Sequence, residues 1–175
     1  MMLSLVGLPG SGKSTIGRQL ARRLNLPFTD SDHVIEQRIG CSIRDFFARE
    51  GETAFRDVEE AVIEQLTRSE PGVLATGGGT VLRPLNRQRL REAGPVIYLR
   101  STPEEVFRRV RHDAKRPLLQ VGDPLQRLRD LYAERDPLYR ETAHFVVETG
   151  RPSVGRLVQM ILAQLELAGL IPGRP

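Results

Sequence analysis

The chain has 175 residues, one cysteine and a net charge of +4, with 39% hydrophobic and 27% charged residues. The length and composition favour one globular domain, and a single cysteine excludes an internal disulfide. A nucleic-acid partner is not expected, because positive and negative charges are interspersed, aromatic residues are few and tryptophan is absent. The apolar runs are too short to cross a bilayer, and the chain enters a strand too early for a signal peptide, so we expect a cytoplasmic protein with no membrane contact.

The first predicted strand, at 3–6, leads into the sequence GLPGSGKST at 7–15 and a helix at 15–24. A G-x-x-x-x-G-K-S pattern between a strand and a helix is typical of a phosphate-binding loop, because backbone N–H groups and the helix N-terminus face the phosphate. Since only two of the 26 lysine and arginine residues are lysines, Lys13 indicates a need for a compact ammonium group. The alternative is a glycine-rich helix cap that binds nothing. The expected nucleotide contacts are Gly10, Ser11, Gly12, Lys13, Ser14 and Thr15, with the Ser14 hydroxyl on Mg²⁺.

Strand and helix patterns alternate along the rest of the chain. Further strands are expected at 28–29, 73–76, 96–99 and 145–148, and further helices at 54–66, 85–91, 103–110, 125–139 and 154–167. This alternation predicts an α/β fold, a three-layer sandwich in which helices cover both faces of a central parallel sheet.

Two aspartates, Asp30 and Asp32, follow the short strand at 28–29. In a doubly wound sheet the ends of strands near the phosphate loop face the ligand crevice. We therefore expect Asp30 to support the metal and Asp32 to contact a substrate hydroxyl. The alternative is an ordinary helix N-cap, for which Asp-Ser is a common sequence.

Three consecutive glycines, Gly77, Gly78 and Gly79, directly follow the strand at 73–76. Glycines here allow backbone N–H groups to approach a ligand closely, and a flexible tight turn is the competing interpretation. This strand does not end in the aspartate that often supports the metal in phosphate-loop proteins. That role therefore falls to Asp30 in our prediction.

Two arginines and one polar segment complete the candidate features. Arg56 opens a helix and is suited to a bidentate pair with a carboxylate, whereas Arg135 alone would be interpreted as a solvated helix residue. The segment 111–124 is polar, contains Lys115 and Arg116, and is predicted to be a mobile lid over the phosphates, with an ordinary surface loop as the alternative.

Six motifs, in this order, resemble the shikimate kinase family across almost the whole chain. They are GLPGSGKST at 7–15, DSD at 30–32, GCSIRDFFAREGETAFR at 40–56, TGGGTV at 76–81, RPLL at 116–119 and RDPLYRETA at 135–143. The resemblance implies a fold like that of the nucleoside monophosphate kinases. It also implies transfer of phosphate from MgATP to the 3-hydroxyl of shikimate, in the pathway to aromatic amino acids.

The resemblance also implies roles at the acceptor site. Asp32 would hold the hydroxyls of shikimate and accept the proton of the attacking one, although orientation alone is an alternative. Arg56 and Arg135 would bind the carboxylate, and Gly78 would add a backbone contact.

At the donor site, the resemblance implies that Arg116 closes over the transferring phosphates and acts in catalysis together with Lys13 and Asp32. Ser14 would bind Mg²⁺ with Asp30 helping through water, and Arg109 and Arg151 would lie near the adenine. The implied organisation is a core at 1–31, 61–110 and 125–168, a substrate-binding segment at 32–60, a lid at 111–124 and a loose tail at 169–175, in a monomer.

Two alternatives stay open at this point. Another small-metabolite kinase, such as a gluconate kinase, would share the phosphate loop but would not need two arginines beside the glycine triplet. A nucleotide-switched binding module would carry an N-K-x-D motif, and neither Lys13 nor Lys115 stands in that setting.

Overall fold

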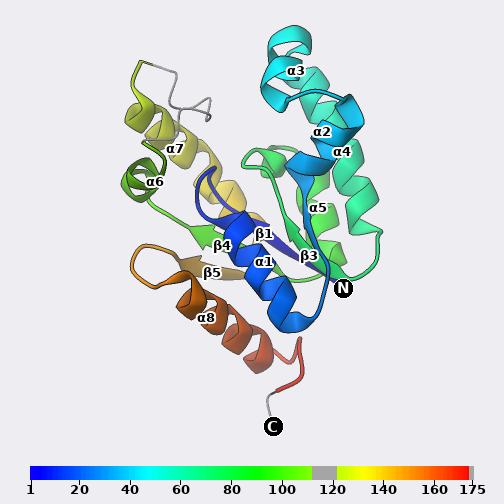
Figure 1. The fold of residues 1–175 in the computed structure, drawn as a ribbon, viewed down its shortest axis with the longest axis vertical. Coiled ribbons are helices and arrows are strands. Elements are labelled where there is room, and N and C mark those ends of the chain that lie inside the picture. Colours follow the sequence, from blue (N-terminus) through cyan, green and yellow to red (C-terminus); the bar gives the residue numbers. More distant parts are fainter. Residues whose placement is uncertain (112–121, 174–175) are drawn as a thin grey trace.

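The computed structural model describes residues 1–111 and 122–173, and its centre is one five-stranded sheet (Figure 1). All the strand pairs are parallel, and the strand order is β2-β3-β1-β4-β5. The strands are β1 (Met2–Val6), β2 (Phe28–Asp30), β3 (Gly72–Ala75), β4 (Val96–Arg100) and β5 (Phe145–Glu148). The central strand is β1, so the loop that follows it leaves from the middle of the sheet.

Helices cover both faces of this sheet, which confirms the predicted three-layer α/β architecture. One face packs against α1 (Lys13–Leu24) and α8 (Val154–Leu167). The other face packs against α4 (Glu52–Thr67), α5 (Pro84–Ala93), α6 (Pro103–Val110) and α7 (Pro124–Thr142). Two further helices, α2 (Ser31–Ile39) and α3 (Ile43–Glu50), rise from the sheet beside α4 in Figure 1.

Burial of the sheet on both faces explains why its central strands consist mostly of apolar residues. Along β1, Leu3 and Leu5 belong to the cluster on the α1 and α8 side, whereas Met2 and Val6 belong to the cluster on the α4 to α7 side. Successive side chains of a strand point to opposite faces, so a strand covered on both faces needs apolar residues at nearly every position. The sequence pattern is therefore a direct consequence of the three layers.

The bounds of β5, α6 and α8 agree with the sequence predictions, and the other predicted elements are one to three residues longer or shifted at their ends. The largest extension is in α7, which continues to Thr142 instead of ending at residue 139. Its last turn is stabilised from another element, because Arg91 Nη1 on α5 donates to the carbonyl oxygen of Thr142 at 3.0 Å. No local sequence pattern near the end of α7 indicates this hydrogen bond from Arg91.

The sequence analysis did not predict α2, α3 or the short 3₁₀ helix at Thr80–Leu82. Both α-helices have good caps: Asp30 caps α2, and Ser42 caps α3 by accepting from the Asp45 N–H at 3.1 Å. However, α3 has no buried residue. Its apolar residues Ile43, Phe46 and Phe47 share one face and are only partly buried, and a helix of 8 residues gives a short periodic pattern that is difficult to recognise in a sequence.

Two predicted segments need separate comment. Most of the lid predicted at 111–124, with Lys115 and Arg116, lies outside the described residues. In the tail expected to be loose from 169, the Leu170 N–H donates to the Leu165 carbonyl oxygen at 2.9 Å, and Ile171 packs against the core. The described helices include none with both the length and the apolar character needed to cross a membrane.

Candidate active site

The loop between β1 and α1 forms one side of a polar cavity of about 340 Å³. Gly12, the N-cap of α1, has a φ of 94°, a left-handed conformation that favours glycine. It turns the chain so that α1 begins at Lys13 with its N-terminus towards the cavity. Five of the six predicted nucleotide contacts line this cavity, namely Gly10, Gly12, Lys13, Ser14 and Thr15. Ser11 is buried behind them.

Lys13 is buried within its own loop, with 8% of its surface exposed. Its Nζ donates to the carbonyl oxygens of Gly7 and Leu8, at 2.8 Å in both cases. The ammonium group is thus held at the cavity wall by neutral acceptors, which bind it more weakly than a phosphate oxygen would.

Asp30 ends β2 and performs two tasks with its two carboxylate oxygens. Oδ1 accepts from the Asp32 N–H at 2.9 Å and so caps α2, which confirms the N-cap interpretation. Oδ2 accepts from Ser14 Oγ at 2.7 Å, which joins the two predicted metal residues. The next strand, β3, ends at Ala75 and supplies no carboxylate, as expected.

The residues at this point fit Mg²⁺. A serine hydroxyl and an aspartate carboxylate are the hard oxygen donors that Mg²⁺ prefers, and Mg²⁺ commonly takes its other ligands from phosphates and water. Within residues 1–111 and 122–173, no cluster of three or more His, Cys, Asp or Glu side chains is arranged to hold a metal.

Asp32 lies on the first turn of α2, where the polar cavity meets a second one. Burial raises the pKa of Asp32 from 3.8 to about 6, with further increases from the negative charges of Asp30 and Glu59, while Lys13 acts in the opposite direction. A carboxyl with this pKa is mostly ionised at neutral pH and is still able to take up a proton.

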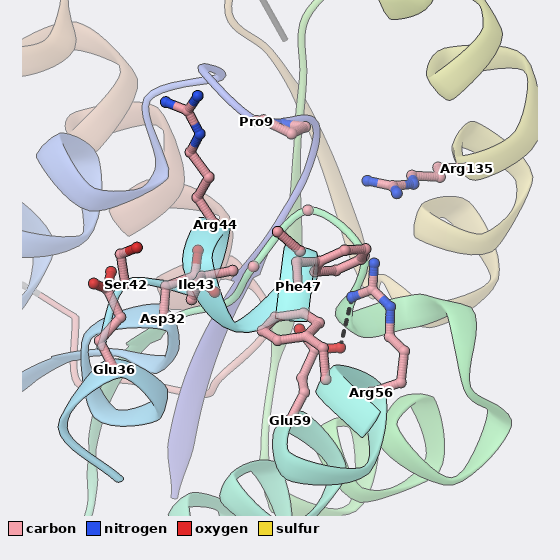
Figure 2. A pocket seen from close by; sticks show the side chains of 15 residues that line it. Pro9, Asp32, Glu36, Ser42, Ile43, Arg44, Phe47, Arg56, Glu59 and Arg135 are labelled. Atoms are coloured by element: carbon pink, nitrogen blue, oxygen red, sulfur yellow. Dashed lines mark hydrogen bonds and ion pairs between the residues drawn. The ribbon is translucent and has the colours of Figure 1, made fainter. Parts of the chain in front are cut away.

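The second cavity has a volume of about 690 Å³ and is bounded by α2, α3, α4, α7 and the glycine triplet (Figure 2). Pro9, Asp32, Gly77 and Gly78 line both cavities, so the two are adjacent compartments of one site. In the view of Figure 2, the guanidinium groups of Arg56 and Arg135 lie on the side opposite Asp32 and Glu36. Arg44 lies on the side of Asp32 and Glu36, and Glu59 is paired with Arg56, so each side of the larger cavity carries charges of both signs.

Arg56 is held by a buried carboxylate. Its Nη1 donates to Glu59 Oε1 at 2.9 Å, and Thr80 Oγ1 donates to Glu59 Oε2 at 3.1 Å. Arg56 Nε is buried and has no hydrogen-bond partner among the described residues, and the same holds for Arg135 Nε. Arg135 is only 9% exposed, so its interpretation as a solvated helix residue was wrong. The face of α7 that carries Arg135 packs towards the glycine triplet, which lies far away in the sequence.

The glycine triplet is where the loop after β3 approaches both arginines and the phosphate loop. A Cβ atom on Gly78 would lie 2.7 Å from Pro9 Cδ and 3.3 Å from Arg135 Nη1. A Cβ atom on Gly77 would lie 2.7 Å from Asp32 Oδ1. Larger residues would therefore clash with Pro9 and Asp32, so this turn needs glycine for close packing and not only for flexibility.

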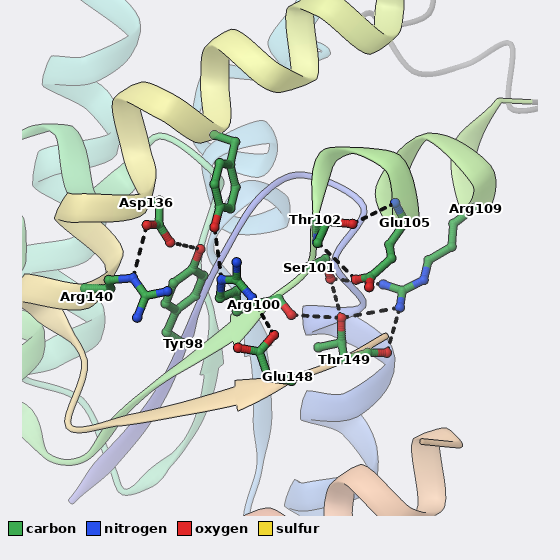
Figure 3. A network of polar contacts seen from close by, with 11 residues as sticks. Tyr98, Arg100, Ser101, Thr102, Glu105, Arg109, Asp136, Arg140, Glu148 and Thr149 are labelled. Carbon is green, nitrogen blue, oxygen red and sulfur yellow. Dashed lines mark hydrogen bonds and ion pairs between the residues drawn. The ribbon is translucent and has the colours of Figure 1, made fainter. Parts of the chain in front are cut away.

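The predicted adenine contacts have different surroundings. Arg109 on α6 donates from Nη2 to the Thr149 carbonyl oxygen at 2.9 Å and from Nη1 to the Ser11 carbonyl oxygen at 3.4 Å, which ties the end of β5 to the phosphate loop (Figure 3). Arg151, two residues beyond Thr149, is exposed, and neither cavity includes it. Arg116 lies outside the described residues.

The structure adds residues to the acceptor cavity that sequence reasoning did not select. Pro9 belongs to a motif that was recognised, and Glu59 lies just beyond the motif at 40–56, but nothing local marked either as part of a site. Glu36 lies one turn after Asp32 on α2, a spacing that becomes visible only when α2 is known. The others come from α3 and the start of α4, and are Ser42, Ile43, Arg44, Phe47, Ala48 and Phe55.

A model of the protein family described as shikimate kinase matches residues 9–166. The chain belongs to the shikimate kinase family. It is 66% identical to a shikimate kinase from Paracidovorax citrulli (strain AAC00-1) over 178 aligned residues, which cover 100% of this chain and 97% of the relative. A solved structure of shikimate kinase from Acinetobacter baumannii in complex with shikimate is 46% identical and has a TM-score of 0.90, covering 96% of this chain and 93% of that one.

The wider fold is shared beyond the family. A crystal structure of a gluconokinase from Sinorhizobium meliloti 1021 has a TM-score of 0.56 at 19% identity, covering 95% of this chain and 92% of that one. That likeness extends to the fold alone, so the arrangement of the acceptor cavity decides between the two kinds of kinase.

Proposed function

We propose that this member of the shikimate kinase family transfers the γ-phosphoryl group of MgATP to the 3-hydroxyl of shikimate, giving shikimate 3-phosphate and ADP for aromatic amino acid biosynthesis. The observation that carries the proposal is the junction of the two cavities at Asp32, Gly77 and Gly78. One cavity is lined by the phosphate loop. In the other, Arg56 and Arg135 lie on one side, with Glu59 paired to Arg56, and Asp32, Glu36 and Arg44 lie on the opposite side.

In the acceptor cavity, Arg56 and Arg135 bind the carboxylate of shikimate. Each has a buried Nε that makes no hydrogen bond to a described residue, with Glu52 Oε1 in a longer ion pair 3.6 Å from Arg56 Nε, and an anion would satisfy both groups. Glu59 keeps Arg56 in place and offsets part of its charge when the cavity is empty. Fixing the carboxylate on this side directs the ring hydroxyls towards Asp32 and the phosphate loop, and the backbone of the triplet Gly77–Gly79 contacts the substrate.

In the transfer step, Asp32 orients the 3-hydroxyl and accepts its proton as the oxygen bonds to phosphorus and the bond from phosphorus to the leaving ADP oxygen breaks. A group with a pKa of about 6 suits this task near neutral pH. Since the transition state of phosphoryl transfer is loose, alignment of the hydroxyl accounts for a large share of the effect. Lys13 turns from its loop carbonyls to the phosphates and stabilises their charge.

Ser14 and Asp30 hold Mg²⁺, which neutralises charge on the transferring phosphates when bound. We place Arg116 over the phosphates, on a lid at 111–124 that closes on a core at 1–31, 61–110 and 125–168, with 32–60 as the acceptor segment. Arg109 and Arg151 are the proposed adenine contacts. The Arg109 bonds to Ser11 and Thr149 support a position beside the nucleotide.

A coupled ADP-release assay with shikimate, gluconate and nucleoside monophosphates tests this function. The expected result is turnover of shikimate, with activity on the other acceptors at least a thousandfold lower. Turnover of gluconate without turnover of shikimate would identify the rival kinase. In the same assay, Asp32→Asn should abolish transfer to shikimate while the dissociation constant for MgATP stays within about threefold of the wild-type value.

We further infer that the enzyme acts in the cytoplasm as a monomer. The single cysteine, which needs no oxidising compartment, supports the location. Sedimentation of the active enzyme at assay concentrations checks the oligomeric state.

A further inference from the structure

Tyr139 carries a buried hydroxyl that the proposed function does not use. It lies on α7 one turn after Arg135, has no exposed surface, and donates to the Gly78 carbonyl oxygen at 2.6 Å. We propose that Tyr139 is a positioning residue of the acceptor site that fixes the peptide between Gly78 and Gly79. The identity of the acceptor in this inference rests on the proposed function.

The Tyr139 bond determines where an amide of the glycine triplet points. The described residues contain no cis peptide, and in a trans peptide the N–H points opposite to the C=O. Because the Gly78 carbonyl faces Tyr139, the Gly79 N–H is directed away from it. Neither the Gly78 N–H nor the Gly79 N–H donates to another described residue, and both glycines line the larger cavity.

The peptide between Gly78 and Gly79 needs an external anchor. The Gly77 and Gly79 carbonyl oxygens accept from nearby backbone groups, the Thr80 N–H at 3.2 Å and the Leu82 N–H at 3.0 Å. For Gly78 the donor is a side chain 61 positions further along the chain. Two adjacent glycines rotate easily about φ and ψ. Without the Tyr139 hydroxyl, this peptide would sample orientations that misdirect its N–H.

Tyr139 is itself well supported. Its ring packs on the ring of Tyr98 with centroids 4.9 Å apart, and the Tyr98 hydroxyl donates to Asp136 Oδ1 at 2.7 Å (Figure 3). Burial raises the pKa of Tyr139 far above its usual value, so its hydroxyl stays a donor throughout the working pH range. Since Arg135 is one turn away on the same helix, Tyr139 also couples the carboxylate-binding arginine to the glycine triplet.

A pair of matched variants tests the inference. Tyr139→Phe and Tyr98→Phe each remove one buried phenolic hydroxyl from the same ring pair, but only the first removes the bond to Gly78. We expect Tyr139→Phe to raise KM for shikimate about tenfold, which corresponds to about 1.4 kcal/mol, and to leave KM for ATP within twofold. Tyr98→Phe should leave both constants within twofold. An unchanged KM for shikimate in Tyr139→Phe, or an equal rise in Tyr98→Phe, would overturn the proposal.

Two measurements keep this test independent of the acceptor's identity and of folding. In the ligand-free enzyme, amide hydrogen exchange of the peptide at 76–82 should be at least fivefold faster in Tyr139→Phe and unchanged in Tyr98→Phe. Equal exchange in all three proteins would refute the positioning role even if the enzyme used another acceptor. Placing 4-aminophenylalanine at 139 restores a para donor and should return KM for shikimate to within threefold of wild type, whereas a persistent tenfold rise in this variant would refute the role of the donor.

Discussion

Replacing Asp32 with asparagine should make the protein more stable while it abolishes phosphoryl transfer. The carboxyl is buried next to Asp30 and Glu59, and its pKa is raised from 3.8 to about 6. The folded state therefore binds the proton of Asp32 more tightly than the unfolded state does. As the pH rises from about 4 to about 6, this group lowers the stability of the folded state, and above that range the loss stays constant.

The size of the effect follows from the two pKa values. At pH 8 the group is ionised in both states, and a difference of roughly two pKa units corresponds to about 3 kcal/mol of lost stability. At pH 5 Asp32 is mostly protonated in the folded state, and the loss is only about 1.5 kcal/mol. Asparagine has a similar volume and does not ionise. Asp32→Asn should therefore gain stability over the wild type, and the gain should be about 1.5 kcal/mol larger at pH 8 than at pH 5.

Urea unfolding of both proteins at pH 5, 6 and 8 measures this gain, with Asp45→Asn as a control because Asp45 is exposed on α3. The control should be indifferent to pH over this range. A gain that is the same at pH 5 and pH 8 would refute the raised pKa, and a loss of stability at pH 8 would show that Asp32 is not under electrostatic strain. In the wild type, kcat/KM for shikimate should fall about tenfold per pH unit below pH 6.

Three further variants test the remaining parts of the site. Arg135→Ala should raise KM for shikimate roughly 100-fold and leave the affinity for MgATP unchanged, since charge-assisted bonds in a buried site are worth about 2–3 kcal/mol. The control is Arg129→Ala, because Arg129 is an exposed arginine of the same helix. Loss of ATP binding in Arg135→Ala would contradict the assignment. Asp30→Asn keeps an oxygen that caps α2 but loses the negative charge. The Mg²⁺ concentration for half-maximal activity should therefore rise at least about tenfold, while the free energy of unfolding changes by less than about 1 kcal/mol. An unchanged Mg²⁺ requirement would show that Asp30 does not bind the metal. Glu59→Gln leaves Arg56 without its buried counter-charge and should lower the free energy of unfolding by about 3 kcal/mol. A variant as stable as the wild type in urea would contradict the structural role of the Arg56–Glu59 pair.

The sheet and the phosphate loop could be predicted because their sequence signals are local. Burial on both faces makes the central strands mostly apolar, as in β1 with Leu3 and Leu5 on one side and Val6 on the other. The helix at Pro103–Val110 begins at a capping box between Thr102 and Glu105, and its predicted bounds agree with the structure. The phosphate loop is likewise one continuous segment whose chemistry depends on its own backbone.

The acceptor cavity could be predicted only in part, because its walls come from distant segments. Arg135 looked like a solvated helix residue until α7 was seen to pack against the glycine triplet. The helices α2 and α3, which form the opposite wall, are short and have few buried residues, and the apolar face of α3, formed by Ile43, Phe46 and Phe47, spans little more than one helical turn. The bond between Tyr139 and Gly78 joins positions 61 residues apart, and no sequence pattern in either segment indicates it.

The central claim is that one ligand meets Asp32, Arg56 and Arg135 beside the phosphate loop. A crystal structure of the enzyme with ADP, Mg²⁺ and shikimate tests it most directly. We predict that the shikimate carboxylate lies between the guanidinium groups of Arg56 and Arg135, that its 3-hydroxyl is within hydrogen-bond distance of Asp32, and that this hydroxyl faces the phosphates held by Lys13. Shikimate bound outside this cavity, or with its carboxylate towards Asp32, would contradict the account.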